Sequence, residues 1–446
     1  MTSSNRVSVA IIGGGIGGLC LAIGLLRNNN LDVTIYETAP KFAEIGAGVA
    51  LGPNAQRALA LISPAAEQAF KIHATASLSS EFEHVWFDFR NGNAGEKDGE
   101  VLSKVENETG QQTVHRAKFL DELVKLIPRE VAQFGKRLVH IHKDPVSGSV
   151  QYKLFFEDGT TASADCVIGA DGIHSSVRKH LLGESHPAAN PVFTGTVVYR
   201  GLVPMDVARD AIGEFADNSY MWCGDGGMVM TYPIDHGETM NVVATRDRKG
   251  RWDNPPYTKP VDEETLRNDF AGWGQIPSKV IQLLQQPTMW AILDHFPAPY
   301  YYYGNVAIMG DAAHATTPFQ GAGAGQAIED ALVLSTLFQQ VTNSGLVKPA
   351  LAAYENVRLR RSQRVVATSR DALKLFCFND GYVDGDAERW KEVWDGRMNW
   401  LWGMNLEKQN GDALNFFANI VEKQASAREE VPKLGTVSLP IAQATV

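Results

Sequence analysis

The residues from Gly13 to Gly18 (GGGIGG) have the spacing of a loop that binds the phosphates of a dinucleotide. In such a GxGxxG pattern the first glycine, Gly13, permits a tight turn, and the second, Gly15, lets backbone amides approach a pyrophosphate. The third, Gly18, allows the following helix to pack closely. Glu37 comes about 20 residues further on and can accept hydrogen bonds from both hydroxyls of an adenosine ribose. These residues therefore predict a dinucleotide site.

The elements needed to position this loop are indicated by the pattern around it. Residues 7–12 (VSVAII) are typical of a buried parallel strand, residues 19–26 have helical periodicity, and residues 31–36 (LDVTIY) indicate a second strand. The glycine loop then joins the first strand of a βαβ unit to its helix. A further parallel strand is expected at 305–309, with a helix at about 323–339, so the nucleotide-binding domain is predicted to be discontinuous.

Two later segments bear on which dinucleotide is bound. Residues 169–178 (GADGIHSSVR) include Asp171, and residues 310–314 (GDAAH) are followed by Pro318 and by the glycine-rich turn 321–325 (GAGAG). Together with the first loop, these segments resemble in order and spacing the motifs of the flavoprotein aromatic hydroxylases, which have the para-hydroxybenzoate hydroxylase fold. The resemblance implies bound FAD, molecular oxygen as a substrate, and NADH or NADPH as a transient electron donor, since no second GxGxxG sequence occurs.

The 310–314 segment has a physical role that suits a flavin. Asp311 closes an apolar run, where its carboxylate can accept a hydrogen bond from a ribityl hydroxyl, and the glycine-rich turn opens a helix whose positive end can stabilise a reduced flavin ring. The residues that the resemblance assigns to the cofactor are Gly48, Ala50, Arg116, Asp171, Asp311, Pro318, Gly323, Ala324 and Gly325. For Arg116 the alternative is a solvated helix start. For His314 we expect a structural role rather than proton transfer.

The substrate is expected to lie under an antiparallel sheet, because apolar and polar residues alternate in several strands between about residues 192 and 243. The alternation places Arg200 on an apolar face and Tyr232 in line with Met228. Arg200 and Tyr232 resemble the pair with which fungal dearomatising phenol hydroxylases of this family hold a phenolate, so both are predicted to be catalytic. The alternatives are a strand-end arginine paired with a surface carboxylate and a tyrosine that only packs.

Within the family, the resemblance is greatest to the salicylate hydroxylases and extends over most of the chain. It implies that NAD(P)H reduces FAD, that oxygen adds at flavin C4a, and that the hydroperoxide hydroxylates the carbon bearing the carboxylate of a hydroxybenzoate, which leaves as carbon dioxide. Met228 and Phe319 stand where the bacterial salicylate enzymes have histidines, so we expect a more apolar substrate pocket. Arg90 is available to meet a substrate carboxylate, and an exposed strand-end arginine is the alternative.

Other functions stay open on the sequence alone. One is hydroxylation or dearomatising hydroxylation, without decarboxylation, of another phenol such as 4-hydroxybenzoate, a resorcinol or a polyketide-derived phenol. A second is a flavin-binding regulator without enzymatic activity. A third is an NAD-dependent dehydrogenase, against which the 310–314 segment argues.

The composition of the chain limits the classes of protein and the cellular compartments that we expect. The chain has 446 residues and a formal net charge of -10 with the signs mixed, which argues against a nucleic-acid surface. Its 4 cysteines lie far apart without metal-ligand spacing, so we expect reduced thiols, a cytoplasmic protein and no metal. No stretch approaches the roughly 18 apolar residues that would span a membrane. We expect a monomer or homodimer.

The predicted fold is α/β, with a Rossmann-like FAD-binding domain, an inserted, mainly antiparallel substrate domain and a C-terminal helical segment. The FAD-binding domain is expected to comprise residues 1–75, 100–185 and 286–365. The substrate domain is expected to comprise residues 76–99 and 186–285, and the C-terminal helices and tail residues 366–446. In the last segment we expect the tryptophans to pack against the other domains rather than to form a site; they are Trp390, Trp394, Trp400 and Trp402.

Overall fold

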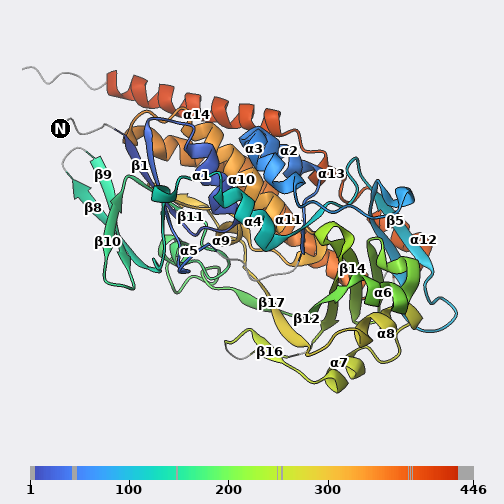
Figure 1. Ribbon diagram of the computed structural model, residues 1–446. Coiled ribbons are helices and arrows are strands. Elements are labelled where there is room, and N and C mark those ends of the chain that lie inside the picture. Colours follow the sequence, from blue (N-terminus) through green and yellow to red (C-terminus); the bar gives the residue numbers. More distant parts are fainter. Residues whose placement is uncertain are drawn as a thin grey trace, which may run out of the picture.

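The computed structural model describes residues 6–42, 48–146, 149–248, 250–252, 255–379, 381, 383 and 385–429. Figure 1 shows two lobes, each built on a large sheet, with the long helix α11 (Val347–Phe376) running from one lobe to the other. The tail that the sequence predicts beyond residue 429 lies outside the described residues.

The first lobe contains a six-stranded sheet whose neighbours are parallel except for its edge pair β18–β19. In order across the sheet its strands are β18 (Tyr302–Tyr303), β19 (Val306–Ile308), β11 (Cys166–Gly169), β1 (Val7–Ile12), β2 (Leu31–Tyr36) and β7 (Ala132–Gln133). Strands β1 and β11 are apolar at almost every position because both of their faces are covered. Strands far apart in the sequence are neighbours in this sheet.

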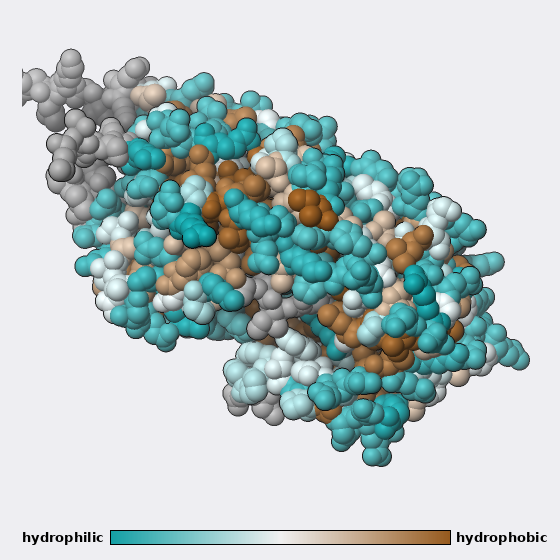
Figure 2. Space-filling view, in the orientation of Figure 1, coloured by the Kyte–Doolittle hydropathy of each residue, from teal (hydrophilic) through white to brown (hydrophobic). Residues whose placement is uncertain are grey.

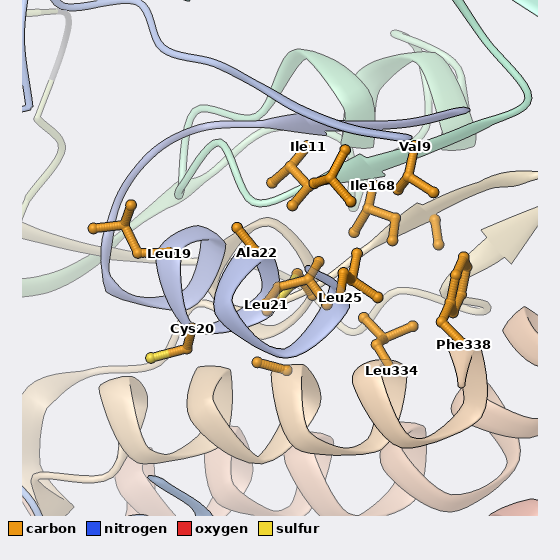
Figure 3. Close-up of a cluster of buried hydrophobic side chains, with 14 of the residues drawn as sticks. Val9, Ile11, Leu19, Cys20, Leu21, Ala22, Leu25, Ile168, Leu334 and Phe338 are labelled. Atoms are coloured by element: carbon orange, nitrogen blue, oxygen red, sulfur yellow. The ribbon is translucent and has the colours of Figure 1, made fainter. Parts of the chain in front are cut away.

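Helices cover this sheet. The helix of the βαβ unit, α1 (Ile16–Leu25), packs against β1, β2 and α10 (Gly323–Phe338), and it is apolar nearly all round for that reason. Figure 3 shows Leu21 and Leu25 of α1 between Ile168 of the sheet and Leu334 of α10. The other helices of this lobe are α2 (Pro53–Ile62), α3 (Pro64–Lys71), α4 (Arg116–Val124), α5 (Ser176–Leu182) and α9 (Asp311–His314).

The second lobe contains an eight-stranded sheet that is antiparallel except between β13 and β4, as the mainly antiparallel prediction requires. Its strands in order are β16 (Thr258–Pro260), β17 (Thr288–Asp294), β12 (Val192–Pro204), β15 (Thr239–Asp247), β14 (Gly227–Ile234), β13 (Tyr220–Gly224), β4 (Val85–Asn91) and β5 (Val101–Glu106). The predicted substrate domain, residues 76–99 and 186–285, leaves out β5 and β17. Both strands nevertheless belong to this sheet, because β17 pairs with β12 and β5 pairs with β4.

One face of the eight-stranded sheet packs against helices that follow its strands in the sequence. These helices are α6 (Met205–Ile212), α7 (Glu263–Asp269) and α8 (Gln275–Gln282). Alternate side chains on β12, β14 and β15 point to the opposite face, toward the first lobe. That second face is the one that carries Arg200 and Tyr232.

Two smaller sheets and the C-terminal helices complete the fold. The three-stranded sheet consists of β8 (Leu138–Val146), β9 (Ser149–Phe156) and β10 (Thr161–Ala164), and the two-stranded sheet of β3 (Gly48–Ala50) and β6 (Thr113–His115). After α11 come α12 (Ala387–Trp394), α13 (Asn399–Trp402) and α14 (Leu406–Glu429). Helix α14 packs on α10 and α11, along the upper edge of Figure 1.

The surface is mostly polar on the face shown in Figure 2, where apolar side chains form separate patches. No helix among the described residues combines the length and the apolar character needed to cross a membrane. All 4 cysteines are buried and free.

Candidate active site

A cavity of about 730 Å³ is lined by residues of both large sheets. Fifteen of the residues that the sequence analysis predicted for the cofactor or substrate site line it. They are Gly13, Gly15, Glu37, Gly48, Ala50, Arg116, Asp171, Arg200, Met228, Tyr232, Asp311, Pro318, Phe319, Gly323 and Ala324. The structure therefore brings the three separate motifs and the antiparallel sheet to one place.

The glycine loop at the end of β1 leaves no room for side chains. Gly13 has a φ of 103°, in the left-handed region that favours glycine, and a Cβ there would overlap the carbonyl of Ala170. Gly15 precedes α1 in an extended conformation, and no side chain caps the helix, so its first amides can meet a phosphate. Gly18 does not line the cavity. A Cβ on Gly18 would overlap the carbonyl oxygen of Gly13, so this glycine brings α1 close to the loop, as predicted.

Glu37 lies at the end of β2, beside the glycine loop. Its Oε2 atom accepts a hydrogen bond from the Gly14 amide at 2.7 Å, and its Oε1 atom accepts one from the Ala39 amide at 2.8 Å. Each carboxylate oxygen can accept a further bond, because an ionised carboxylate has about four acceptor sites. The side chain is thus held in place with capacity left for two ribose hydroxyls.

Asp171 has a more structural role than the sequence suggested. Although it lines the cavity, its carboxylate accepts hydrogen bonds from the Ser176 amide at 2.8 Å and the Val177 amide at 3.2 Å, and so holds the first turn of α5. Arg178, in the same helix, is fully buried and donates to the carbonyls of Ala312 at 2.8 Å and Ala313 at 2.9 Å. This arginine, which the sequence analysis did not single out, ties the two later motifs together.

Buried charged side chains stabilise the turn that carries Asp311. The Asp330 carboxylate accepts from the Gly310 amide at 2.9 Å, and it contacts His314 Nε2 at 2.5 Å and Arg358 Nε at 2.7 Å. Burial acts to raise the pKa of Asp330, but the attraction of His314 and Arg358 outweighs it and lowers the pKa to about 2. His314 therefore has the structural role expected of it.

Asp311 itself faces the cavity. Within the described part of the chain its carboxylate has no hydrogen-bonding side-chain or amide partner, so it can accept from a ribityl hydroxyl. Gly323 and Ala324 line the cavity at the start of α10, which no side chain caps. Gly325 does not line it; a Cβ there would press on Ala55 of α2, so glycine at this position lets α10 and α2 pack closely.

Arg200 is the cation of the substrate end of the cavity. It shares its face of the sheet with Val198, Met230 and Val243, and its guanidinium lies 5.8 Å from the ring centre of Trp290. The side chain is exposed to the cavity, and the protein around it lowers the pKa of the guanidinium by partial desolvation. Among the described residues no carboxylate pairs with it, so the guanidinium can bind an anion that enters the cavity.

Tyr232 lies on the neighbouring strand β14. Its hydroxyl donates to the Gly48 carbonyl at 3.2 Å, which links the substrate sheet to the strand expected to line the flavin. Burial raises the pKa of Tyr232 to about 12, although Arg200 and Asn241 act to lower it. The hydroxyl is therefore protonated at neutral pH and able to donate to a substrate oxygen.

Two predictions about the substrate end need correction. Arg90 does not reach the cavity, because the alternation of β4 turns it to the face opposite Phe87 and Phe89, where it pairs with the buried Asp88 at 2.9 Å. Trp394 does line the cavity, although the tryptophans of this segment were expected only to pack.

Met398 also lines the cavity and was missed. Helix α12 ends at Trp394 and Met398 lies in the turn before α13, so no helical spacing in the sequence could have identified both residues as wall. Met228 and Phe319 line the same end and make that part of the wall apolar.

Three features fit FAD beside a small aromatic anion: a phosphate loop without side chains, carboxylates placed for ribose and ribityl hydroxyls, and an apolar chamber that contains the guanidinium of Arg200. This arrangement defines the class of FAD-dependent monooxygenases. The family model described as "FAD binding domain" matches residues 6–369, so the chain belongs to that family.

The chain is similar along its whole length to individual members. It is 87% identical over 446 residues, which is 100% of both chains, to 6-methylsalicylate 1-monooxygenase atA of Aspergillus terreus. It is 37% identical to a salicylate hydroxylase of Pseudomonas putida, over 91% of this chain and 93% of that protein. A solved salicylate hydroxylase–substrate complex superposes with a TM-score of 0.83 at 33% identity, covering 92% of this chain and 98% of the other.

The comparisons confirm the main prediction of the sequence analysis. The chain is an FAD-dependent aromatic monooxygenase of the salicylate hydroxylase type, which acts on a small aromatic substrate with oxygen and NAD(P)H. A dehydrogenase and a flavin-binding regulator are thereby excluded.

Proposed function

We propose that this enzyme oxygenates 6-methylsalicylate at ring carbon 1, with release of carbon dioxide and formation of 3-methylcatechol. The observation that carries the proposal is the 87% identity, over the full length of both chains, to a protein named 6-methylsalicylate 1-monooxygenase. Carbon 1 of a salicylate bears the carboxylate, so the ring can regain aromaticity after oxygenation there only if the carboxylate departs. The substrate anion, NAD(P)H, oxygen and two protons then give 3-methylcatechol, NAD(P)⁺, carbon dioxide and water.

Bound FAD supplies the redox chemistry, in that it takes up hydride from NAD(P)H and activates oxygen. Arg200 binds the anionic oxygens of the substrate, since its guanidinium is charged at neutral pH and stands in the cavity. When the substrate binds, the Tyr232 hydroxyl turns from the Gly48 carbonyl and donates its one proton to the phenolic oxygen, and its pKa, raised to about 12, keeps it protonated. Together the two side chains orient the ring so that the carbon bearing the carboxylate faces the flavin.

The apolar wall keeps water from the reacting carbon. Met221, Met228 and Phe319 line the substrate end, and their exposed fractions are 2%, 1% and 4%. Electrostatic contacts are stronger where water is excluded, and reducing equivalents are then directed to the substrate rather than to hydrogen peroxide. Met228 and Phe319 are apolar where the bacterial salicylate enzymes have histidines, and an apolar wall suits a ring that carries a methyl group.

The test is turnover by the purified FAD-containing protein with NADH and then NADPH, in which oxygen, carbon dioxide, hydrogen peroxide and phenolic products are followed together. The substrates are 6-methylsalicylate, salicylate, 4-hydroxybenzoate and 3-methylphenol. One carbon dioxide and one 3-methylcatechol for each NAD(P)H support the proposal. Hydroxylation of 3-methylphenol alone, or of 6-methylsalicylate without loss of carbon dioxide, would replace it by hydroxylation without decarboxylation.

We also propose a cytoplasmic enzyme that acts as a monomer or homodimer. The burial of all 4 thiols without a disulfide supports a reducing compartment. Light scattering of the purified protein decides between the two oligomeric states, and fractionation of the producing cells tests the location.

A further inference from the structure

Asn241, on β15, is a buried polar residue next to the substrate end of the cavity. Its side chain is fully buried, and it is not among the residues that line the cavity. Neither its amide nitrogen nor its side-chain oxygen has a hydrogen-bond partner in the described part of the chain. A buried amide without a partner is costly, because it has given up its hydrogen bonds to water. Asn241 therefore has the capacity to form a hydrogen bond in another state of the enzyme.

The register of the sheet places Asn241 beside Tyr232. The two residues are directly opposite each other on β15 and β14, so their side chains share one face and their Cβ atoms are about 4.5–5.5 Å apart. On its other side Asn241 is opposite Leu202 of β12, whose side chain has no polar atom. The Asn241 amide also acts to lower the pKa of the Tyr232 hydroxyl. Of the two cross-strand neighbours, Tyr232 is thus the one with which Asn241 can form a hydrogen bond.

The Tyr232 hydroxyl has different partners in the free and the substrate-bound enzyme. In the structure it donates its one proton to the Gly48 carbonyl at 3.2 Å. A substrate phenol requires the same proton, so the hydroxyl must turn away from Gly48 when the phenol binds. A phenolic oxygen can accept a hydrogen bond while it donates one. The turned hydroxyl of Tyr232 can therefore accept from a donor on the neighbouring strand.

We propose that Asn241 is a positioning residue that holds Tyr232 in its substrate-binding orientation. When Tyr232 donates to the phenolic oxygen, the side-chain amide of Asn241 donates to the Tyr232 oxygen. The result is a chain of two hydrogen bonds that ends at the substrate, and consecutive bonds in such a chain strengthen one another. Asn241 itself touches neither substrate nor cofactor. The inference rests on the proposed function, in which the substrate carries a phenolic oxygen.

A double-mutant cycle separates this role from a general contribution to the fold. The unmodified enzyme is compared with Asn241→Leu, Tyr232→Phe and the variant that carries both changes. Each FAD-containing protein is titrated calorimetrically with 6-methylsalicylate, and its flavin content and melting temperature are measured. Leucine keeps the branching of asparagine without its polar atoms. Because the replaced amide has no partner in the described part of the chain, Asn241→Leu should not lower the melting temperature.

Thr245 provides the matched control. It lies on the same strand and the same face as Asn241, and it is also fully buried. Its hydroxyl likewise has no hydrogen-bond partner among the described residues. On β14, however, Thr245 is opposite Met228 and not opposite a tyrosine. Thr245→Val therefore removes a buried polar atom without a direct effect on Tyr232.

We expect Asn241→Leu to raise the Kd for 6-methylsalicylate by about 2- to 12-fold when Tyr232 is present, which is the range of one neutral hydrogen bond. In the Tyr232→Phe background the same change should leave the Kd as it was, because no hydroxyl is left to position. Thr245→Val should leave the Kd unchanged in both backgrounds.

An equal loss of affinity from Asn241→Leu in both backgrounds, or no loss in either, would overturn the role of Asn241. A loss of the same size from Thr245→Val would overturn it as well, because any buried polar atom of β15 would then have the effect. Failure of the unmodified enzyme to bind 6-methylsalicylate would instead overturn the proposed function. The failures are distinguishable because the first two compare variants and the third is a property of the unmodified enzyme.

Discussion

Replacing Arg200 by glutamine should abolish most substrate affinity and leave the fold intact. A charge-assisted hydrogen bond contributes about 1.5–3 kcal/mol, which corresponds to roughly 10- to 150-fold in Kd. Because the guanidinium stands in a cavity that is open to water before substrate binds, we expect the lower half of that range. The free energy of unfolding should hardly change, since no carboxylate among the described residues loses a partner when Arg200 is removed.

Arg90 provides the matched control, because both arginines lie on strands of the same sheet and both were predicted to contact the substrate, Arg200 at its phenolate and Arg90 at its carboxylate. Arg90 pairs with Asp88, which is fully buried, on the far side of β4 from the cavity. Arg90→Gln leaves that carboxylate without its partner, so it should cost about 2 kcal/mol of folding free energy. Substrate affinity should stay close to that of the unmodified enzyme.

The two variants are compared by calorimetric titration with 6-methylsalicylate and by urea unfolding. We expect the two variants to show opposite effects. Arg200→Gln loses substrate affinity and keeps its stability, whereas Arg90→Gln loses stability and keeps its substrate affinity. Flavin content is measured in both proteins, so that loss of cofactor is not mistaken for loss of substrate binding. If Arg90→Gln weakened binding as much as Arg200→Gln, the placement of the carboxylate at Arg200 would be refuted.

Three further predictions concern residues that support the cofactor end of the site. Arg358→Met should lower the free energy of unfolding by about 3–5 kcal/mol in urea titrations, because it leaves buried carboxylates short of a partner; a loss below about 1 kcal/mol, the range of exposed pairs, would contradict this. Asp330 has a folded pKa of about 2 against an ordinary 3.8, so its contribution is present above the higher value and is lost as pH falls through the lower one. The stability difference between unmodified enzyme and Asp330→Asn should therefore shrink between pH 5 and pH 2.5, and a constant difference would argue against the ion pair. Gly18→Ala should yield protein with little FAD by absorbance, because the added Cβ overlaps the Gly13 carbonyl, while Gly411→Ala, which meets nothing within 4 Å, should retain it.

The cofactor end of the site was largely predictable because its chemistry is encoded over short stretches. A tight turn with positive φ and a close approach of backbone to phosphate require glycine at fixed spacing, so Gly13 and Gly15 could be assigned from the chain alone. Glu37 could be assigned for the same reason, since it ends the strand that follows. Asp171 and Gly325 were in the right segments, but whether each faces the cavity or the neighbouring helix depends on packing.

What the sequence by itself determined is therefore the FAD-binding α/β architecture, the motifs of the cofactor site and the presence of a cation on an apolar strand face. Only the tertiary structure showed that Arg200 lines the cavity and Arg90 does not, because strand alternation shows that side chains have two faces but not which face meets the cofactor. It also decided the wall at Trp394, which depends on α12 packing against a sheet formed nearly 300 residues earlier. Contacts of that range arise from the packing of elements distant in sequence, and local patterns carry little information about them.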